Sequence, residues 1–324
     1  MSTPFTIIAP CSTSNLGAGF DALGVALGGP RLAIRCTPGG PDLRIVALSG
    51  EGASSLSRGS DNRILVAARA AAERIGVPFE SLRGELSIDN TIPLARGLGS
   101  SAAAAVGGAI LAEALAARLG GDALHSNDLA GASATAFNDT RVLATALALE
   151  GHPDNVIASL RGGAQVAVLD AQGVVRACPL KIAAPLRAAI FIPDQELRTS
   201  EARAVIPRTV PLSDAVFNLG RAALFVAALG AGERDLLGEA MTDRLHQPAR
   251  STLMPWLPHL IEAARSAGAY GAALSGAGTT VFALVPPEAS ERVVEALRAR
   301  AAELSVPGRA LSVDAFAAGA RIEQ

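Results

Sequence analysis

The sequence has almost no lysine and few cysteines, and each shortage excludes a class of site. Lys181 is the only lysine among 324 residues. A Walker A loop requires a lysine directly after its last glycine, and Lys181 lies in no such setting, so that phosphate-binding motif is excluded. Cys11, Cys36 and Cys178 are odd in number and form no C-x-x-C pair. We therefore expect neither a disulfide framework nor a zinc site, but ordinary buried thiols.

An excess of positive charge is also missing, because the formal net charge is -2. Nucleic acids and anionic membrane surfaces attract broad basic fields, so neither is an expected partner. The apolar tract over 101–119 contains glycine, Glu113 and Arg118, and it fits a buried helix better than a membrane span. Residues 1–10 lack the basic and apolar regions of a signal peptide, which predicts a cytoplasmic protein.

The length and the pattern of expected elements predict an α+β protein with two domains, over residues 1–180 and 181–324. The first domain is expected to have strands over 5–9, 31–36, 84–89 and 164–169, and helices over 62–75, 100–119 and 127–149. The second is expected to have strands over 188–193, 272–275 and 281–285, and helices near 203 and over 214–229, 252–266 and 288–304. The glycine-rich segment 17–29 is interpreted as a functional loop between strands.

One stretch places glycines and two serines directly before a long helix. It reads Pro93, Leu94, Ala95, Arg96, Gly97, Leu98, Gly99, Ser100, Ser101, Ala102, Ala103. Glycines let backbone amides wrap an anion, and the unpaired amides of a first helical turn add partial positive charge. The alternative is a glycine-containing cap of a core helix. The loose dinucleotide pattern G-x-G-x-x-A also matches, but a proline interrupts the strand that this motif requires and the downstream segment stays helical.

This stretch resembles the phosphate-binding motif of the GHMP kinases, which phosphorylate small alcohols. Segments 10–21 and 275–281 lie where that family has two further motifs, and segment 10–21 is similar to that of members acting on homoserine. The resemblance implies ATP and Mg²⁺ as cofactors and L-homoserine as substrate. It also implies a two-domain fold, with an N-terminal domain like the second domain of ribosomal protein S5 and a ferredoxin-like C-terminal domain. A homodimer is implied by analogy alone.

A polar cluster of Glu150, His152, Asp154 and Asn155 surrounds a proline turn. Acid, imidazole and amide groups at this density suit metal or substrate binding, although a glutamate at a helix end is often merely solvated. The resemblance implies that Glu150 binds Mg²⁺ together with Ser101, with Ser100 as the alternative serine. Asp154 is the hypothetical general base, Asn155 is a further catalytic candidate, and direct attack without a base stays open.

The remaining candidate residues would bind the substrate or the nucleotide. Asn15 and Asp21 could hold the ammonium and hydroxyl groups of an amino alcohol, or could simply form Asx turns. Arg203 and Arg250 match positions at which the family's homoserine kinases bind the substrate carboxylate, a task suited to the bidentate guanidinium. His152 is a third expected substrate contact, or packs its own loop. Asn62 resembles a nucleotide-site residue, while its context indicates a helix cap.

Three other functions compete with this interpretation. Another GHMP kinase would act on a different alcohol, such as mevalonate or shikimate. A catalytically silent binding protein is possible on any fold, since a fold does not fix a function. An NAD-dependent enzyme is disfavoured by the missing strand before the glycines.

Overall fold

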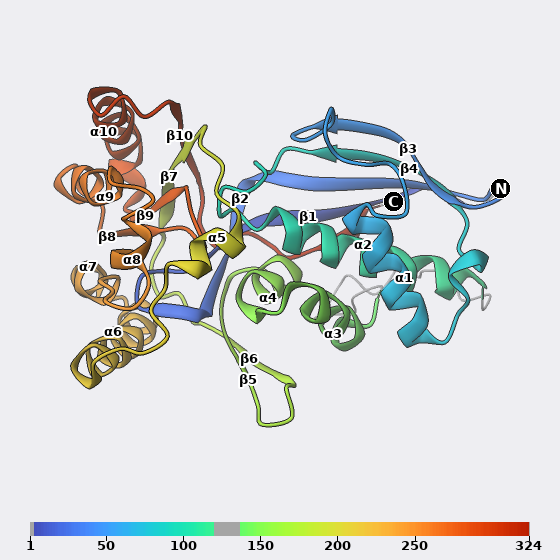
Figure 1. Cartoon of the computed structure of the whole chain (residues 1–324), viewed down its shortest axis with the longest axis horizontal. Coiled ribbons are helices and arrows are strands. Elements are labelled where there is room, and N and C mark those ends of the chain that lie inside the picture. The colour runs from blue at the N-terminus through green and yellow to red at the C-terminus, as the bar shows by residue number, and fades with distance from the viewer. Residues whose placement is uncertain (1–2, 120–136, 324) are drawn as a thin grey trace.

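The computed structural model describes residues 3–119 and 137–323, which form two groups of elements around two separate sheets (Figure 1). The larger sheet has seven strands in the order β11-β1-β2-β4-β3, with β5 on β2 and β6 on β5. Its strands are β1 (Phe5–Asn15), β2 (Gly19–Pro38), β3 (Leu43–Gly50), β4 (Gly84–Asn90), β5 (Ala164–Leu169), β6 (Val175–Pro179) and β11 (Arg321–Glu323).

Four helices accompany this sheet: α1 (Arg63–Ile75), α2 (Ser100–Leu119), α3 (Asp139–Glu150) and α4 (Pro153–Arg161). A short 3-10 turn, η1 (Phe79–Ser81), precedes β4. α2 and α4 pack against β1 and β2, and α1 packs against α2. The small residues of α2 permit this close packing: a methyl group on Gly108 would lie 2.3 Å from the Ile64 carbonyl oxygen of α1. The part of the expected helix over 127–136 lies outside the described residues.

The second sheet is antiparallel, with the order β10-β7-β9-β8. Its strands are β7 (Arg187–Pro193), β8 (Gly271–Leu274), β9 (Val281–Val285) and β10 (Gly308–Asp314). Helices α9 (Leu257–Ser266) and α10 (Ser290–Glu303) pack against it and share its core. The other elements here are α5 (Thr199–Ala204), α6 (Leu212–Ala231), η2 (Arg234–Leu236), α7 (Leu237–Ala240), α8 (Gln247–Arg250) and η3 (Pro287–Ala289).

Among the described residues, two helices, α2 and α6, are long and apolar enough to cross a membrane by length and composition. In α2, 72% of the apolar window is buried inside the protein, which makes it the core helix that the sequence predicts. In α6 the corresponding share is 22%. The exposure of α6 is not expected from the sequence.

The glycine-rich segment 17–29 is not a loop, and that expectation is wrong. Only the tight turn at 16–18 is irregular, and β2 runs unbroken from Gly19 to Pro38. Gly24 lies in this strand opposite Ser14 of β1. A methyl group on Gly24 would lie 2.1 Å from the backbone oxygen of Asp154. The glycine is therefore required by a close approach of α4 and not by a turn.

Several other expectations also change. The expected turn at 151–155 is shorter, because α4 already begins at Pro153. The helix expected over 252–266 begins at Leu257. Cys11 and Cys36 are buried thiols as predicted, whereas Cys178 is exposed on β6. The expectations did not include β3, β6, β10 or β11, and β11 returns from the chain's end to pair with β1. Our boundary near residue 180 stays a proposal.

Candidate active site

A cavity of about 290 Å³ brings together the polar residues that the sequence singled out. It lies where the start of α2, the end of α3, the start of α4 and α5 converge at the centre of Figure 1. Its lining includes Asn15, Asp21, Pro93, Ala95, Arg96, Gly97, Leu98, Gly99, Ser100, Ser101, Ala102, Glu150, His152, Asp154, Asn155, Arg203 and Arg250. These residues come from both groups of elements.

The loop before α2 is held from three directions by backbone hydrogen bonds. The Ser12 amide of β1 donates to the Leu98 carbonyl at 3.1 Å, the Leu197 amide to the Ala95 carbonyl at 2.9 Å, and the Thr280 amide to the Arg96 carbonyl at 3.1 Å. Ala103 is the first residue whose amide donates within the helix, to the Gly99 carbonyl. The amides before it are therefore available at the cavity wall, where the helix dipole favours an anion.

Gly97 shows why this loop needs a glycine. Its φ of 74° lies in the left-handed region, and a methyl group there would lie 2.1 Å from the carbonyl oxygen of Ser275. The Ser275 hydroxyl in turn donates to the Gly97 carbonyl at 2.6 Å. The segment 275–281 thus closes over the loop with backbone against backbone.

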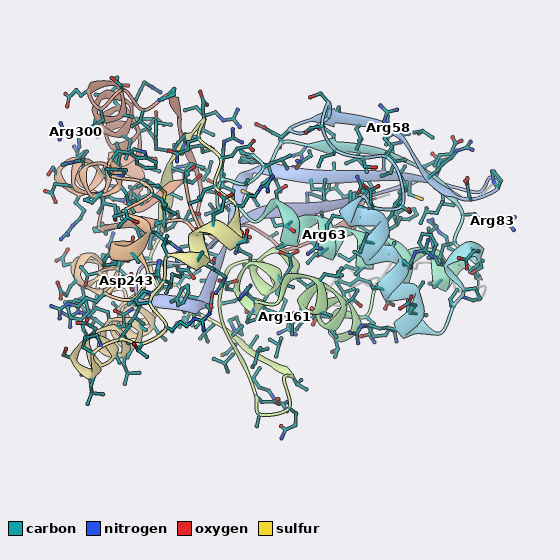
Figure 2. All side chains as sticks on the ribbon, in the orientation of Figure 1. Arg58, Arg63, Arg83, Arg161, Asp243 and Arg300 are labelled. Carbon is teal, nitrogen blue, oxygen red and sulfur yellow. The ribbon has the colours of Figure 1, made fainter. Side chains whose placement is uncertain are left out.

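Glu150 and Ser101 lie together at the cavity. The Ser101 hydroxyl donates to Glu150 Oε1 at 2.7 Å, and the same oxygen forms an ion pair with Arg63. Arg63, in the first turn of α1, lies near the centre of the molecule in Figure 2. Within residues 3–119 and 137–323, no group of three or more His, Cys, Asp or Glu side chains gathers to hold a metal. One carboxylate beside one hydroxyl suits Mg²⁺, which keeps several waters and takes further oxygens from substrate phosphates.

Asp154 and Asn155 occupy the first turn of α4, facing β1. Asn155 is fixed on both sides, because it accepts a hydrogen bond from the Ser12 hydroxyl and donates one to the Ser14 hydroxyl, each at 2.9 Å. Asp154 is 4% exposed, and its carboxylate accepts a hydrogen bond from the Asn155 amide at 2.7 Å. Burial, aided by the negative charge of Asp21, raises the pKa of Asp154 above its usual range.

Asp21 and Arg203 form a bidentate ion pair across the cavity, with nitrogen to oxygen distances of 2.6 and 3.1 Å. Both side chains are about one-third exposed. Asn15 lies behind them in a left-handed conformation with a φ of 71°. Its side chain donates to the Gly276 carbonyl at 2.8 Å and accepts from the Asp21 amide at 3.0 Å. Neither contact is that of an Asx turn, because the Asp21 amide is six residues further along the chain. Asn15 instead ties the Asp21 backbone to the segment at Gly276.

Arg250 is the most deeply buried charge of the site, at 1% exposure. Its Nη1 donates to the Gly276 carbonyl at 2.9 Å and to His246 Nδ1 at 3.1 Å. No hydrogen bond involving its Nη2 is found among the described residues. Burial, together with the nearby Arg203 charge, lowers the pKa of Arg250 to about 10. The guanidinium thus stays charged at neutral pH and keeps a donor for a ligand.

His246 holds Arg250 in place, and sequence reasoning missed it. Its Nε2 lies 2.9 Å from the Gly17 carbonyl oxygen, which only accepts, and its Nδ1 faces an arginine, which only donates. The hydrogen-bond network therefore assigns a neutral ring protonated at Nε2. Burial lowers the pKa of His246, consistent with that state. The i to i+4 spacing of His246 and Arg250 in one short helical segment was the available signal.

A second cavity of about 670 Å³ adjoins the first and shares Arg63, Ala95, Ser100 and Ser101 with it. Its other walls are largely apolar and include Leu48, Leu56, Ile88 and Leu94. Asn62 lines this cavity and also caps α1, accepting from the Ile64 amide at 3.0 Å and donating to the Ser57 carbonyl at 2.7 Å. The start of α2 therefore lies between two cavities.

His152 lines the first cavity and makes no side-chain cap to α4, where it is the N-cap residue. Besides His246, the sequence reading missed Ser14, Arg63 and Thr199 on the cavity wall. Ser14 precedes Asn15 within the quoted motif, so its position was the signal. No sequence signal marked Arg63 or Thr199 as site residues, because only the packing of α1 and α5 brings them to this cavity.

Comparison with known proteins gives concordant matches. The family description "GHMP kinases N terminal domain" matches residues 62–163, and "GHMP kinases C terminal" matches residues 225–303. Homoserine kinase of Caldanaerobacter subterraneus is 38% identical over 89% of this chain and 86% of that protein. Homoserine kinase of Deinococcus radiodurans is 42% identical over 86% and 83%, respectively. The crystal structure of homoserine kinase from Cytophaga hutchinsonii matches with a TM-score of 0.82 and 26% identity, covering 100% of this chain and 98% of that one.

Proposed function

The chain belongs to the GHMP kinase family, and from that premise we propose that it transfers the γ-phosphoryl group of ATP to the side-chain hydroxyl of L-homoserine. The product is O-phospho-L-homoserine, an intermediate of threonine biosynthesis. One observation carries the proposal. A single cavity is lined by a helix start suited to anions, by a carboxylate beside a serine, and by side chains of opposite charge, namely one aspartate and two arginines.

The opposed charges suit an α-amino acid. Asp21 offers a carboxylate for the substrate ammonium, and Arg203 and Arg250 offer guanidinium groups for the substrate carboxylate. A zwitterion inserted between Asp21 and Arg203 would replace each partner of their ion pair with a group of the same charge, so neither half-buried charge is left unpaired. Mevalonate has a carboxylate but no ammonium, and would leave Asp21 uncompensated.

The nucleotide would span both cavities. Its phosphates would lie at the loop and first turn of α2, and its nucleoside in the more apolar second cavity beside Asn62. Glu150 and Ser101 are the residues that would hold Mg²⁺. When bound, this ion supplies neutralisation of the charge that develops on the transferred phosphoryl group. The chain's own task is to hold the hydroxyl oxygen in line with the γ-phosphorus.

Asp154 is our candidate for the proton acceptor. The homoserine oxygen forms a bond to the γ-phosphorus while the bond from that phosphorus to the bridging oxygen of ADP breaks, and the hydroxyl proton passes to the Asp154 carboxylate. Its raised pKa makes it a stronger base than an exposed aspartate. Asn155, fixed by Ser12 and Ser14, holds this turn of α4 against β1.

The test is ADP release by the purified protein with ATP, Mg²⁺ and L-homoserine, with mevalonate, shikimate and L-threonine in parallel. We expect turnover with homoserine, and its loss in Glu150→Gln, which keeps the size of the side chain and removes the charge. Turnover with mevalonate alone would refute the ammonium-binding role of Asp21, because mevalonate has a carboxylate but no ammonium. No turnover with any alcohol, from a protein that still binds ATP, would favour a silent binding protein.

A further inference from the structure

The partly buried ring of Phe20 lies among the side chains at the cationic end of the first cavity. The guanidinium carbon (Cζ) of Arg203 lies 5.5 Å from the centroid of this ring, and that of Arg250 lies 5.4 Å from it. The ring of His246 stacks on the same ring, with the centroids 5.0 Å apart and the planes at 21°. Phe20 itself is not part of the cavity lining, so it would act on a ligand only through these neighbours.

Arg203 and Arg250 repel each other, because they carry like charges at close range. Arg203 forms an ion pair with Asp21, whereas Arg250 forms none among the described residues. Burial and, second, the charge of Arg203 lower the pKa of Arg250 to about 10. The face of an aromatic ring carries partial negative charge and attracts cations within about 6 Å of its centroid. Phe20 therefore attracts both guanidinium groups without adding a charge that a ligand would have to displace.

An irregular start of β2 brings this ring to the arginines. Neighbouring side chains of a regular strand point to opposite faces, yet Phe20 and Asp21 both contact Arg203. Asp21 has a φ of 57°, in the left-handed region that residues other than glycine seldom adopt. Its amide donates to the Asn15 side chain at 3.0 Å, which holds this conformation. The conformation interrupts the alternation and directs the ring and the carboxylate to the same guanidinium group.

We infer that Phe20 is a positioning residue for the carboxylate of the substrate. Its ring holds the guanidinium groups of Arg203 and Arg250 at a fixed separation. Both can then donate to one carboxylate once the substrate ammonium has taken the place of Arg203 at Asp21. The inference rests on the proposed function, because it takes an α-amino acid as the ligand. Without the ring the two like charges would move apart, and only ligands that carry a carboxylate would bind less tightly.

Phe20→Leu tests this role, because it keeps an apolar side chain and removes the aromatic ring. We expect KM for homoserine to rise about tenfold, equivalent to about 1.4 kcal/mol of binding, while kcat and KM for ATP stay near their wild-type values. Phe20→Tyr retains the aromatic face, so its KM for homoserine should stay within about threefold of wild type. An unchanged KM for homoserine in Phe20→Leu, or an equal loss in the leucine and tyrosine variants, would overturn the inference.

Phe217→Leu is the matched control, because Phe217 is also a partly buried ring in contact with two arginines. The Cζ atoms of Arg221 and Arg244 lie 3.6 and 3.9 Å from its centroid. Phe217 belongs to α6 and is not part of the cavity lining. This variant should lose a comparable amount of stability, while its KM for homoserine stays within about twofold of wild type. A rise in this KM as large as that of Phe20→Leu would indicate a general loss of packing and would refute the inference.

Two analogues of homoserine separate the carboxylate contact from the rest of the site. 2-Aminobutanoate keeps both charges and lacks the hydroxyl, so calorimetry measures its binding without turnover. We expect Phe20→Leu to bind it about tenfold less tightly than wild type. 3-Aminopropan-1-ol lacks only the carboxylate, and its kcat/KM should be the same in both proteins. An equal loss for both compounds would contradict the assigned role.

The same measurements separate this inference from the proposed function. A wild-type chain that binds 2-aminobutanoate about tenfold more tightly than Phe20→Leu, but does not phosphorylate homoserine, would refute the proposed function and support the role of Phe20. A wild-type chain that phosphorylates homoserine, with the same KM as Phe20→Leu, would refute the role of Phe20 alone.

Discussion

Replacing Gly24 with alanine should disable catalysis from a position outside the cavity. A methyl group at Gly24 would lie 2.1 Å from the backbone oxygen of Asp154 and 3.2 Å from the side chain of Ala158. An ordinary carbon to oxygen contact is about 3.3 Å or longer, so β2 and the start of α4 must separate by about 1 Å. The contacted atoms are backbone atoms of Asp154 and the Cβ of Ala158, and rotation of a side chain moves none of them. We expect overpacking to cost about 1–3 kcal/mol of stability.

The same displacement moves Asp154 and Asn155, and a misplacement of about 1 Å at a reacting group can cost about 100-fold in rate. We therefore expect Gly24→Ala to lower kcat by about two orders of magnitude and the melting temperature by a few degrees. KM for ATP should stay near its wild-type value, because the loop before α2 is untouched. Steady-state kinetics and thermal unfolding measure these quantities.

Gly28→Ala is the matched control, in the same strand. Its methyl group would lie 3.0 Å from the Cβ of Asp314, so a shift of a few tenths of an ångström accommodates it. Its kcat should stay within about threefold of wild type. If Gly24→Ala were as active as Gly28→Ala, with an equal melting temperature, the close approach of β2 to α4 would not position Asp154, and our reasoning would be refuted.

Three further outcomes are expected. Glu150→Gln should lower kcat by about 100-fold or more and shift half-saturation by Mg²⁺ upward in a metal titration, because a neutral amide is a poorer magnesium ligand. Since the pKa of Asp154 is raised, wild-type kcat should fall with decreasing pH, through a pKa above the usual ~4 of aspartate. The Asp154→Asn variant should be slow, and its pH profile should lack this acidic limb. His246→Leu removes a hydrogen-bond acceptor from the buried Arg250. KM for homoserine should therefore rise about tenfold, while KM for ATP should stay unchanged. A proportional rise of both KM values would instead assign His246 a general folding role.

The family, the two-domain α+β fold and several elements could be predicted from the sequence and are confirmed. α2 begins and ends at Ser100 and Leu119, and β9 runs over Val281–Val285, both as predicted. These elements carry local signals: glycines and serines before a small-residue helix, and a short apolar run bounded by polar turns. α1 is likewise marked by Asn62 as its cap and Gly76 as its left-handed stop.

The features that could not be predicted from the sequence depend on contacts between distant segments. Gly24 looks like a loop residue until α4 is placed beside it, and β11 has only three residues, paired with β1 across nearly the whole chain. The exposure of α6 was hidden because its inner and outer faces are both apolar, so no amphipathic pattern separates them. His246 is visible as a site residue only once its ring is seen between Gly17 and Arg250.

The arrangement of cations at the loop before α2 bears on how phosphate charge is neutralised. Arg96 belongs to the loop, but its three nitrogens donate to the backbone carbonyls of Pro193, Leu94 and Asp194 at 2.8–2.9 Å. It therefore fastens the loop to the second sheet. Arg63 is paired with Glu150.

The two remaining arginines of the cavity, Arg203 and Arg250, lie with Asp21 at the other charged end. Among the cavity's described residues, every arginine close to the loop is thus already engaged. The phosphate charge would then be neutralised by backbone amides, the helix dipole and the bound metal. No other side chain could take over the role of any of these three. On this argument Arg96→Gln should weaken folding more than ATP binding, and a KM for ATP raised more than tenfold at unchanged melting temperature would contradict it.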